Sequence, residues 1–407
     1  MKQKNKIAIF HCGFIYTGGG ERIVIEEIVG LRKCGYLVDC FVPIYDPRLS
    51  YPDIIKDLDI KTFLPQLPSF VPFRFGILMV LSCLLSPFLA CRFTKYDLIL
   101  GANQPGAFIA WVVSILLRKS YFVYLSQPNR ILYPRDHENW QNIKDYYLLS
   151  KVINKLFKQL VSFLDQKSIT GGKNLFINGS FVAKEICRIY KPKFWIDCPG
   201  GAHTPSRSIL KVNRLVGKAM INGFTIERPY LLLTSRHEPW KKFEWAIQAL
   251  KLVATDYPKI KLIIPGAETA ITLRLRRLVK SLKISQNVIF LGTITQKNLW
   301  KLYEQAAIYV FPSPKEDLGI VVIEAQAYGL PVVAWNFGGP TVTVVNGKTG
   351  YLAKPYDIPD FTQKINSILR SEERRKEMGT NAWEHIKNNF SWKRHLDILQ
   401  SEFKKYS

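Results

Sequence analysis

The sequence has few acidic residues for its length, with 32 Asp and Glu against 57 Lys and Arg, which leaves a formal net charge of +25. The basic excess is spread over both halves of the 407 residues and is not gathered in one tail. No sequence motif of an RNA- or DNA-binding module occurs along the chain. We therefore expect anionic partners other than nucleic acid, namely nucleotide diphosphates or an acidic membrane surface.

Cysteine pairs at Cys-x-x-Cys spacing are also missing, and we expect no leader segment. The beginning, MKQKNKIAIF, has only a short apolar run before His11, which is typical of a first strand and not of a signal peptide. The seven cysteines show no Cys-x-x-Cys spacing, and we interpret them as small buried residues in a reducing compartment. We therefore expect a cytoplasmic protein.

The most apolar segment is residues 70–93. Its uninterrupted part, Ile77 to Cys91, is shorter than the roughly 20 residues that a membrane-spanning helix needs, and Pro87 interrupts it. Basic residues at its ends would suit anionic head groups, so one interpretation is a helix that lies in the membrane interface without crossing it. A buried helix of the N-terminal domain explains the same residues equally well. The first interpretation predicts a peripheral protein on the cytoplasmic face of a membrane.

The remaining composition, 47% hydrophobic and 22% charged, is ordinary for packed globular domains. Strand-like and helix-like segments alternate, which predicts doubly wound parallel sheets with ligands at the carboxyl ends of the strands. The pattern weakens at residues 199–229, where we expect a linker between a domain at 1–198 and another at 230–388. A C-terminal helix within 389–407 is expected to pack back on the first domain, and a lysine-rich helical stretch to reach Lys173.

The segment from Phe311 to Trp335 carries the densest chemical signals. It predicts a strand end, a loop with acids, a short helix beginning near Leu318 or Gly319, and a new strand. Unpaired N–H groups and the positive dipole end make a helix N-terminus a site for anions. Glu316 lies just before this helix and Glu324 inside it. Two acids beside an anion site need hydroxyl groups to bind, as a sugar and a ribose on either side of a diphosphate would supply.

These two glutamates, seven residues apart within EDLGIVVIEAQAYGLPVVA, resemble the signature of the retaining glycosyltransferases of family 4. The resemblance implies an α/β protein of the GT-B fold, with two facing Rossmann-like, doubly wound domains and a cleft between them. It assigns Glu316 to the transferred sugar and Glu324 to the ribose hydroxyls. The resemblance also implies that the N–H groups of Leu318, Gly319 and Ile320 hold the phosphate.

A second match is the octapeptide SRHEPWKK, which begins at Ser235 and is similar to the family's Gly-Arg-Leu-x-Pro-x-Lys-Gly. The resemblance makes Arg236 and Lys241 the cations that bind the diphosphate. An Arg fork and a Lys point charge would neutralise the charge that builds up on the leaving group. With Glu316, they are the expected catalytic residues. Lys242 replaces a glycine of the family pattern, so the backbone of this loop could differ.

Glycines also follow the first strand of the N-terminal domain. Gly18, Gly19 and Gly20 allow a close approach of the backbone to a phosphate. Alone this signal is weak, because glycine loops more often only turn the chain. The position, however, is similar to the family's GGAER loop, which implies a part in binding the donor diphosphate.

The segment Ser126 to Tyr133 resembles the family's Tyr-Cys-His-x-Pro-x-Arg, with one departure. Ser126 stands where a histidine is common, and a hydroxyl is no general base near neutral pH. The role of that histidine on the acceptor side is either vacant here or taken by Gln127 or His11.

The stretch from His11 to Pro47 resembles the mannosyltransferases of lipid-linked oligosaccharide assembly. This implies mannose from GDP-mannose as the donor and a lipid-linked or membrane-proximal glycan as the acceptor. No metal or other cofactor is expected, because the Asp57-x-Asp59 motif, which can hold a divalent ion, has no second acidic cluster with it. No side chain is an obvious covalent nucleophile, so retention would follow from attack on the face that the leaving group departs from.

Three other interpretations remain open. The first is a UDP-sugar-dependent transferase of polysaccharide synthesis. The second is a sugar-nucleotide epimerase or a phosphorylase on the same fold. The third is a non-catalytic protein that binds anionic surfaces, which the basic charge and the departure at Ser126 would suit.

Overall fold

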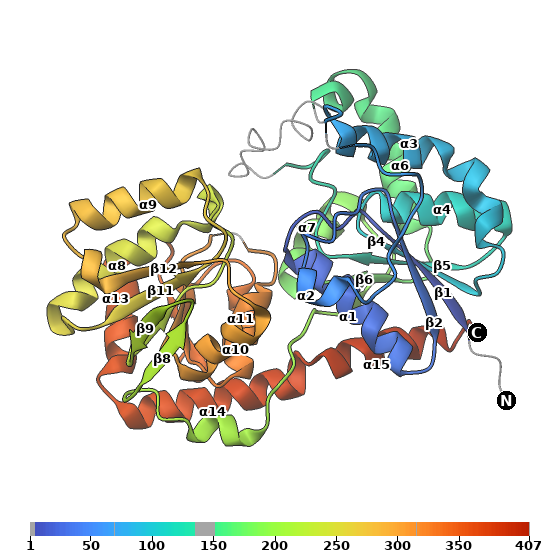
Figure 1. The fold of residues 1–407 in the computed structure, drawn as a ribbon. Coiled ribbons are helices and arrows are strands. Elements are labelled where there is room, and N and C mark those ends of the chain that lie inside the picture. Colours follow the sequence, from blue (N-terminus) through green and yellow to red (C-terminus); the bar gives the residue numbers. More distant parts are fainter. Residues whose placement is uncertain (1–4, 69, 135–150, 315, 407) are drawn as a thin grey trace. The chain divides into compact units, whose positions relative to one another are not determined.

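The structure is a computed structural model that describes residues 5–68, 70–134, 151–314 and 316–406 (Figure 1). The chain divides into two compact units, residues 1–199 with 395–407, and residues 200–394. Part of the helical stretch expected to reach Lys173, residues 135–150, lies outside the described residues. Each unit is built on one parallel sheet with helices on both faces, which confirms the predicted doubly wound architecture.

The sheet of the first unit has seven parallel strands in the order β3-β2-β1-β4-β5-β6-β7. Its strands are β1 (Lys6–His11), β2 (Leu37–Val42), β3 (Lys61–Thr62), β4 (Leu98–Ala102), β5 (Tyr121–Leu125), β6 (Leu175–Ile177) and β7 (Ile196–Asp197). Its helices are α1 (Gly19–Lys33), α2 (Pro52–Ile55), α3 (Arg74–Leu89), η1 (Ala90–Phe93), α4 (Gly106–Leu117), η3 (Ile153–Phe157), α6 (Lys158–Thr170) and α7 (Ser180–Tyr190).

Apolar residues fill both faces of this first sheet. On one face the rings of Phe10 and Phe93 meet edge to face at 4.8 Å, and α4 packs over the middle strands. On the other face Phe403 near the chain end packs its ring 4.9 Å from Phe122 of β5. Strands buried on both faces read as nearly continuous apolar runs, as they do in β1, β4 and β5.

The sheet of the second unit has six parallel strands in the order β12-β11-β10-β13-β14-β15. Its strands are β10 (Tyr230–Leu232), β11 (Lys261–Pro265), β12 (Val288–Gly292), β13 (Ile308–Phe311), β14 (Val332–Trp335) and β15 (Gly350–Ala353). Its helices are η4 (Arg207–Lys211), η5 (Pro239–Lys241), α8 (Phe243–Asp256), α9 (Ala270–Ser281), η6 (Ser285–Asn287), α10 (Gln296–Gln305), α11 (Ile320–Ala327), α12 (Pro340–Thr343), α13 (Ile358–Leu369) and α14 (Glu372–Asn389). The last helix, α15 (Trp392–Phe403), begins in this unit and continues in the first.

The stretch expected to be a linker, residues 199–229, is folded instead. From residue 200 on it belongs to the second unit, and it contains the antiparallel hairpin of β8 (Lys218–Ile221) and β9 (Phe224–Glu227). The inward residues of this hairpin, Ala219, Ile221 and Ile226, join the apolar core on one face of the second sheet. The weak pattern had concealed two short strands, because alternation over four residues carries little signal.

The apolar segment at 70–93 also differs from its prediction. Pro87 does not interrupt it, because α3 continues to Leu89 and η1 extends the helical run to Phe93. The run from Arg74 to Phe93 has 20 residues, enough by length and composition to cross a membrane. Only 28% of its most apolar stretch is buried inside the protein. The interpretation of this segment as a buried core helix is therefore wrong for most of its length.

The cysteines, too, are less buried than expected. All seven are free thiols, as predicted, but only Cys40 and Cys198 are buried, and Cys34 and Cys91 are exposed. Burial of a cysteine depends on which face of an element meets the sheet, and this is decided by tertiary packing.

Candidate active site

The loop between β13 and α11 places a helix N-terminus at the carboxyl edge of the second sheet. The helix α11 begins at Ile320, and the preceding residue, Gly319, has φ +81°. Glycine takes this left-handed backbone without the steric cost that a Cβ would bring. Helical bonding begins where the N–H of Val322 donates to the carbonyl of Gly319 at 2.9 Å. The N–H groups of residues 318–320 precede that pattern, as an anion site at a helix N-terminus requires.

A second loop, after β14, holds the first loop in place. The N–H of Gly339 donates to the carbonyl of Glu316 at 2.6 Å. A Cβ on Gly339 would lie 2.5 Å from backbone atoms of Leu318, so only glycine permits this approach. The indole N–H of Trp335 donates to the carbonyl of Pro312 at 2.8 Å. The backbone that carries Glu316 is thus fixed by contacts from the neighbouring strand.

Lys241 and Glu316 meet although 75 residues separate them. Nζ of Lys241 lies 2.6 Å from Oε2 of Glu316, and the two side chains are 17% and 25% exposed. Lys241 ends η5, shortly after β10, and Glu316 follows β13, which is paired in parallel with β10. Because parallel strands end at the same edge of a sheet, the two motifs are brought together by the fold. The expected cation and the expected sugar-binding acid therefore form one partly exposed ion pair.

Arg236 lies in the same loop as Lys241 but beside a different acid. One of its guanidinium nitrogens, Nη1, lies 3.9 Å from Oε1 of Glu238. Burial raises the pKa of Glu238, and the charges of Arg236 and Lys241 act in the opposite direction. Glu238 therefore lies within electrostatic reach of both cations. The sequence analysis did not single it out, although its place between two matched cations was the available signal.

The next residue, Lys242, has φ +53°, in the left-handed region. Glycine adopts this conformation most readily. Lys242, which replaces the family's glycine, therefore has a backbone conformation that suits glycine. Nζ of Lys242 lies 3.6 Å from Oε1 of Glu244 in the first turn of α8.

Glu324 points to a tyrosine that the sequence analysis missed. The hydroxyl of Tyr303, on α10, donates to Oε2 of Glu324 at 3.3 Å. Burial raises the pKa of Tyr303 well above its ordinary value, and nearby Glu324 adds to this, so the phenol stays protonated and can donate. The same hydroxyl lies 3.0 Å from Oγ1 of Thr234, which in turn lies 2.9 Å from the hydroxyl of Tyr309. This buried hydrogen-bond chain, from Tyr309 through Thr234 to Tyr303, orients the carboxylate of Glu324.

His237 anchors the loop that carries the cations. Its side chain is fully buried, and Nδ1 lies 2.8 Å from Oγ1 of Thr272 on α9. Its carbonyl accepts a hydrogen bond from Oγ1 of Thr269 at 2.8 Å. Burial lowers the pKa of His237, so the ring is neutral at physiological pH. These contacts fix the loop between β10 and η5 against α9.

The expected residues of the first unit lie at the carboxyl ends of its strands. Ser126 follows β5, and its N–H and Oγ lie 2.8 and 2.9 Å from Oδ1 of Asn103, which follows β4. A Cβ on Gly20 would lie 3.4 Å from Oγ of Ser126, so the glycine loop faces this serine. The structure therefore joins Gly20 and Ser126 and adds Asn103, which the sequence analysis missed. Gln127 is half-buried in the same loop.

The remaining glycines of the loop lie at the start of α1, where Gly18 is the N-cap and Gly19 the first residue. His11, the last residue of β1, is fully buried, and Nδ1 of its ring lies 3.2 Å from the carbonyl oxygen of Ala102. Burial lowers the pKa of His11 to about 4, so its imidazole is neutral at physiological pH. The described contacts of His11 therefore join β1 to β4.

Residues 220–385 match the sequence model of the family described as "Glycosyl transferases group 1". The alpha-1,3/1,6-mannosyltransferase ALG2 of Dictyostelium discoideum is 23% identical over 441 residues, which cover 98% of each chain. A GDP-mannose-dependent monoacylated alpha-(1-6)-phosphatidylinositol monomannoside mannosyltransferase of Corynebacterium glutamicum is 33% identical over 191 residues, covering 44% of this chain and 49% of that protein.

Among solved structures, a sucrose-phosphate synthase from Thermosynechococcus elongatus superposes with a TM-score of 0.73 at 19% identity, covering 99% of each chain. This likeness shows the fold, and the fold is GT-B, with two Rossmann-like domains, as the resemblance implied. The matched group 1 domain contains Arg236, Lys241, Glu316 and Glu324. Residues 220–385 therefore carry a group 1 glycosyltransferase domain, and the chain as a whole is similar to glycosyltransferases of GT-B fold.

Proposed function

We propose that the enzyme transfers mannose from GDP-mannose to a lipid-linked or membrane-proximal glycan, with retention of configuration. The observation that carries the proposal is the pair of Lys241 and Glu316, 2.6 Å apart, beside the N-terminus of α11. Mannose is supported by the names of the two relatives, one of which is called GDP-mannose-dependent and acts on a phosphatidylinositol mannoside.

The second unit would hold the donor. Phosphate oxygens would accept hydrogen bonds from the N–H groups at residues 318–320, and Lys241 and Arg236 would supply positive charge. Lys241 is paired with Glu316, and a bound diphosphate would share this lysine, leaving Glu316 to accept sugar hydroxyls. Glu324, oriented by Tyr303, would accept the ribose hydroxyls. Gly18, Gly19 and Gly20 of the first unit would approach the diphosphate, and His11, Ser126 and Gln127 are assigned to the acceptor side.

The proposed roles of these residues follow from the charges that develop on the sugar and on the diphosphate during transfer. When the bond between the sugar and the phosphate breaks, the electron pair goes to the diphosphate and the sugar carbon becomes oxocarbenium-like. The acceptor oxygen then attacks from the face that the leaving group departs from, and its proton passes to a phosphate oxygen. Arg236, Lys241 and the helix end stabilise the charge on the leaving diphosphate, so we propose that the transfer itself requires no metal ion.

We also propose that α3 binds the enzyme to the cytoplasmic face of an anionic membrane. Its exposed surface is apolar, with Leu84 66% and Phe88 79% exposed, whereas two of its buried residues are the serines Ser82 and Ser86. The other two buried residues are Leu78 and Met79, so α3 is apolar on its exposed surface as well as on its buried side, unlike an ordinary amphipathic surface helix. The net charge of +25 adds attraction to acidic head groups. A lipid-linked acceptor would be reached from this position.

The proposal is tested by incubating the purified enzyme with GDP-mannose, UDP-glucose and ADP-glucose, each with and without a lipid-linked oligosaccharide acceptor. We expect release of GDP that depends on the acceptor, and a product whose new linkage has the anomeric configuration of the donor. Release of UDP alone would show that the donor is a UDP-sugar and not GDP-mannose. A product with inverted configuration would contradict the proposed attack on the face that the leaving group departs from. An epimerised or phosphorolysed product without acceptor would favour the other enzyme classes. Binding to vesicles without release of any nucleotide would favour a binding protein.

A further inference from the structure

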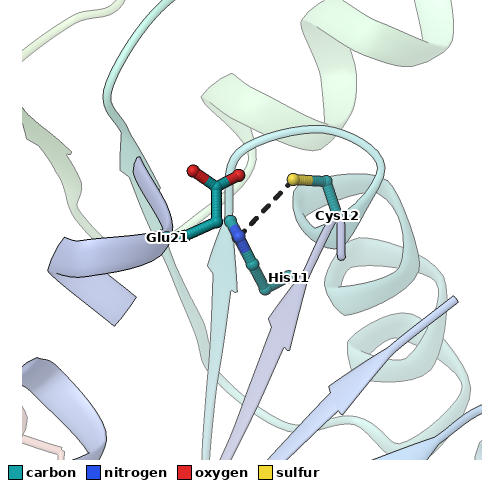
Figure 2. Close-up of side chains that lie close together, drawn as sticks. All are labelled: His11, Cys12 and Glu21. Atoms are coloured by element: carbon teal, nitrogen blue, oxygen red, sulfur yellow. Dashed lines mark hydrogen bonds between the residues drawn. The ribbon is translucent and has the colours of Figure 1, made fainter. Parts of the chain in front are cut away.

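Three potential metal ligands converge in the first unit at the end of β1. His11 ends this strand, Cys12 follows it, and Glu21 lies in the first turn of α1. One ligand atom of each residue lies within 4.8 Å of the others, and Figure 2 shows the three side chains pointing toward one another. Among the described residues this is the group of His, Cys, Asp and Glu side chains close enough together to hold an ion. Asp57 and Asp59 are not part of it.

The tautomer of His11 leaves a nitrogen lone pair aimed at this group. Nδ1 of the ring lies 3.2 Å from the carbonyl oxygen of Ala102, and a carbonyl can only accept, so Nδ1 carries the proton. Nε2 is then the unprotonated nitrogen, and it is also the ring nitrogen nearer to Sγ of Cys12, at 3.5 Å against 3.8 Å. A histidine that donates one ring N–H to a backbone carbonyl while the other nitrogen binds a metal is the usual arrangement in metal sites.

The spacing of sulfur and nitrogen suits one particular geometry. Bond lengths of about 2.3 Å for zinc to sulfur and about 2.0 to 2.1 Å for zinc to nitrogen, at a tetrahedral angle, separate the two ligand atoms by about 3.6 Å. The observed separation of Nε2 in His11 and Sγ in Cys12 is 3.5 Å. The third ligand, Glu21, lies beside the glycine loop: a Cβ on Gly18 would stand 2.4 Å from Oε2 of Glu21.

We propose that His11, Cys12 and Glu21 bind a divalent transition-metal ion of the zinc type. A thiolate and an imidazole favour such an ion over the hard ions Mg²⁺ and Ca²⁺, which take oxygen ligands. Three protein ligands leave the fourth position of a tetrahedral ion open to water or to another oxygen ligand. Cys12 is partly exposed, which gives the ion a route of entry.

The hydrogen bonding of the site fits this role. Nε2 of His11 is the unprotonated ring nitrogen, because Nδ1 donates to the carbonyl of Ala102. Binding of the ion by Cys12 as a thiolate releases one proton into solution. The site lies in the first unit, and it does not depend on the donor chemistry assigned to Lys241 and Glu316 in the second.

The test is a titration of the full-length protein, freed of metal with a chelator, with Co²⁺ and then with Zn²⁺. We expect one equivalent of Co²⁺ to bind with a near-ultraviolet thiolate-to-cobalt absorption band, and Zn²⁺ to displace it. Cys12→Ser should abolish the band and weaken Zn²⁺ binding by more than the roughly 10- to 100-fold that changes behind a metal ligand cost. Glu21→Gln should weaken binding but keep the band, because the thiolate remains.

Cys34→Ser and Cys91→Ser are matched controls, since both thiols are exposed and lie outside the group. Unchanged far-ultraviolet circular dichroism in each variant excludes unfolding as the cause. The proposal is wrong if the unmodified protein shows no thiolate band at one equivalent of Co²⁺, or if the band survives in Cys12→Ser and disappears in a control variant. Because the readout is binding and not transfer, its failure leaves the transferase proposal standing, and failure of the transferase assay leaves this site standing.

Discussion

His395 and Glu27 form a fully buried ion pair, with Nε2 of His395 3.1 Å from Oε1 of Glu27. Nδ1 of His395 lies 3.0 Å from the carbonyl oxygen of Pro199, so it donates there, and 3.4 Å from Sγ of Cys198. Both ring nitrogens therefore face acceptors, and the ring is held as an imidazolium. The pair joins α15, which returns to the first unit at residue 395, to α1 and to the residue at which the chain leaves that unit.

Replacing Glu27 with Gln should destabilise the first unit by about 3 to 5 kcal/mol, because it leaves a buried cation without its partner. The measurement is hydrogen exchange of α1 and of residues 395–403, together with the thermal unfolding midpoint. Adding His395→Gln should restore part of the loss, since residues in direct contact are not additive. Loss in the double variant equal to the sum of the single losses would show that the pair is not coupled.

The same pair should make the first unit less stable as pH rises. Burial alone would lower the pKa of His395, but Cys198 and Glu27 raise it well above 6.5. Burial raises the pKa of Glu27 as well. Both groups hold protons more strongly when folded. The contribution of His395 is therefore complete below its unfolded pKa and is lost as pH rises through its folded pKa, and that of Glu27 is lost over a lower range that begins at the unfolded pKa of Glu27. Unfolding midpoints measured upward from pH 6.5 should fall more steeply for the unmodified protein than for His395→Gln, and parallel curves would contradict this.

Lys241→Ala and Glu316→Gln should each lower turnover by about a hundredfold, as the loss of one charge partner in a transition state does. The measurement is steady-state release of nucleoside diphosphate. Lys376 and Glu372 on α14 give the matched control, because they form an ion pair with the same 2.6 Å separation on an exposed surface. Lys376→Ala and Glu372→Gln should leave turnover unchanged. Near-normal turnover in both site variants would remove the proposed mechanism.

Tyr303→Phe should weaken binding of the nucleoside diphosphate by roughly fivefold, because it removes the hydrogen bond that orients Glu324 and a typical bond is worth about 1 kcal/mol. We expect the loss in KM for the donor and not in kcat. Tyr309→Phe is the control: its hydroxyl also bonds Thr234 in the same buried chain, but no bond joins it to Glu324 in the described structure. Equal effects of the two variants would indicate a general loss of packing.

Leu84→Glu and Phe88→Glu should each reduce binding to anionic vesicles by roughly thirtyfold, since burying one large apolar side chain contributes about 2 kcal/mol. Co-sedimentation with phosphatidylserine vesicles measures this. Leu273→Glu is the control, because Leu273 is 57% exposed but lies on α9 of the second unit. Binding should also fall as salt rises. Equal loss with Leu273→Glu would show that the effect is not specific to α3, and resistance of the protein to salt and alkaline extraction would indicate an inserted helix.

The residues proposed to bind the donor could be named from the sequence because each is carried by a short local pattern. Gly319 and Gly329 occur where a helix must begin and end, and both have positive φ in the structure. The parallel sheets followed from the alternation of apolar strands and helices. The hairpin at 218–227 could not be found in this way, because its strands are four residues long.

The contacts between segments that are distant in the chain could not be predicted, because no local sequence pattern indicates them. Nothing near Glu324 in the sequence indicates Tyr303, and Ser126 gives no sign of Asn103. The exposure of α3 was equally hidden, because its residues are apolar on every side and only packing decides which of them meet the sheet.

The sequence by itself determined the resemblance to family-4 glycosyltransferases, the doubly wound fold and the residues proposed to bind the donor, because these depend on spacing within single motifs. Only the tertiary structure decided which side chains meet: Lys241 with Glu316, Tyr303 with Glu324, His11 with Cys12 and Glu21, and His395 with Glu27. The physical reason is that parallel strands bring residues far apart in the chain to one edge of a sheet, where burial and hydrogen bonding select the partners.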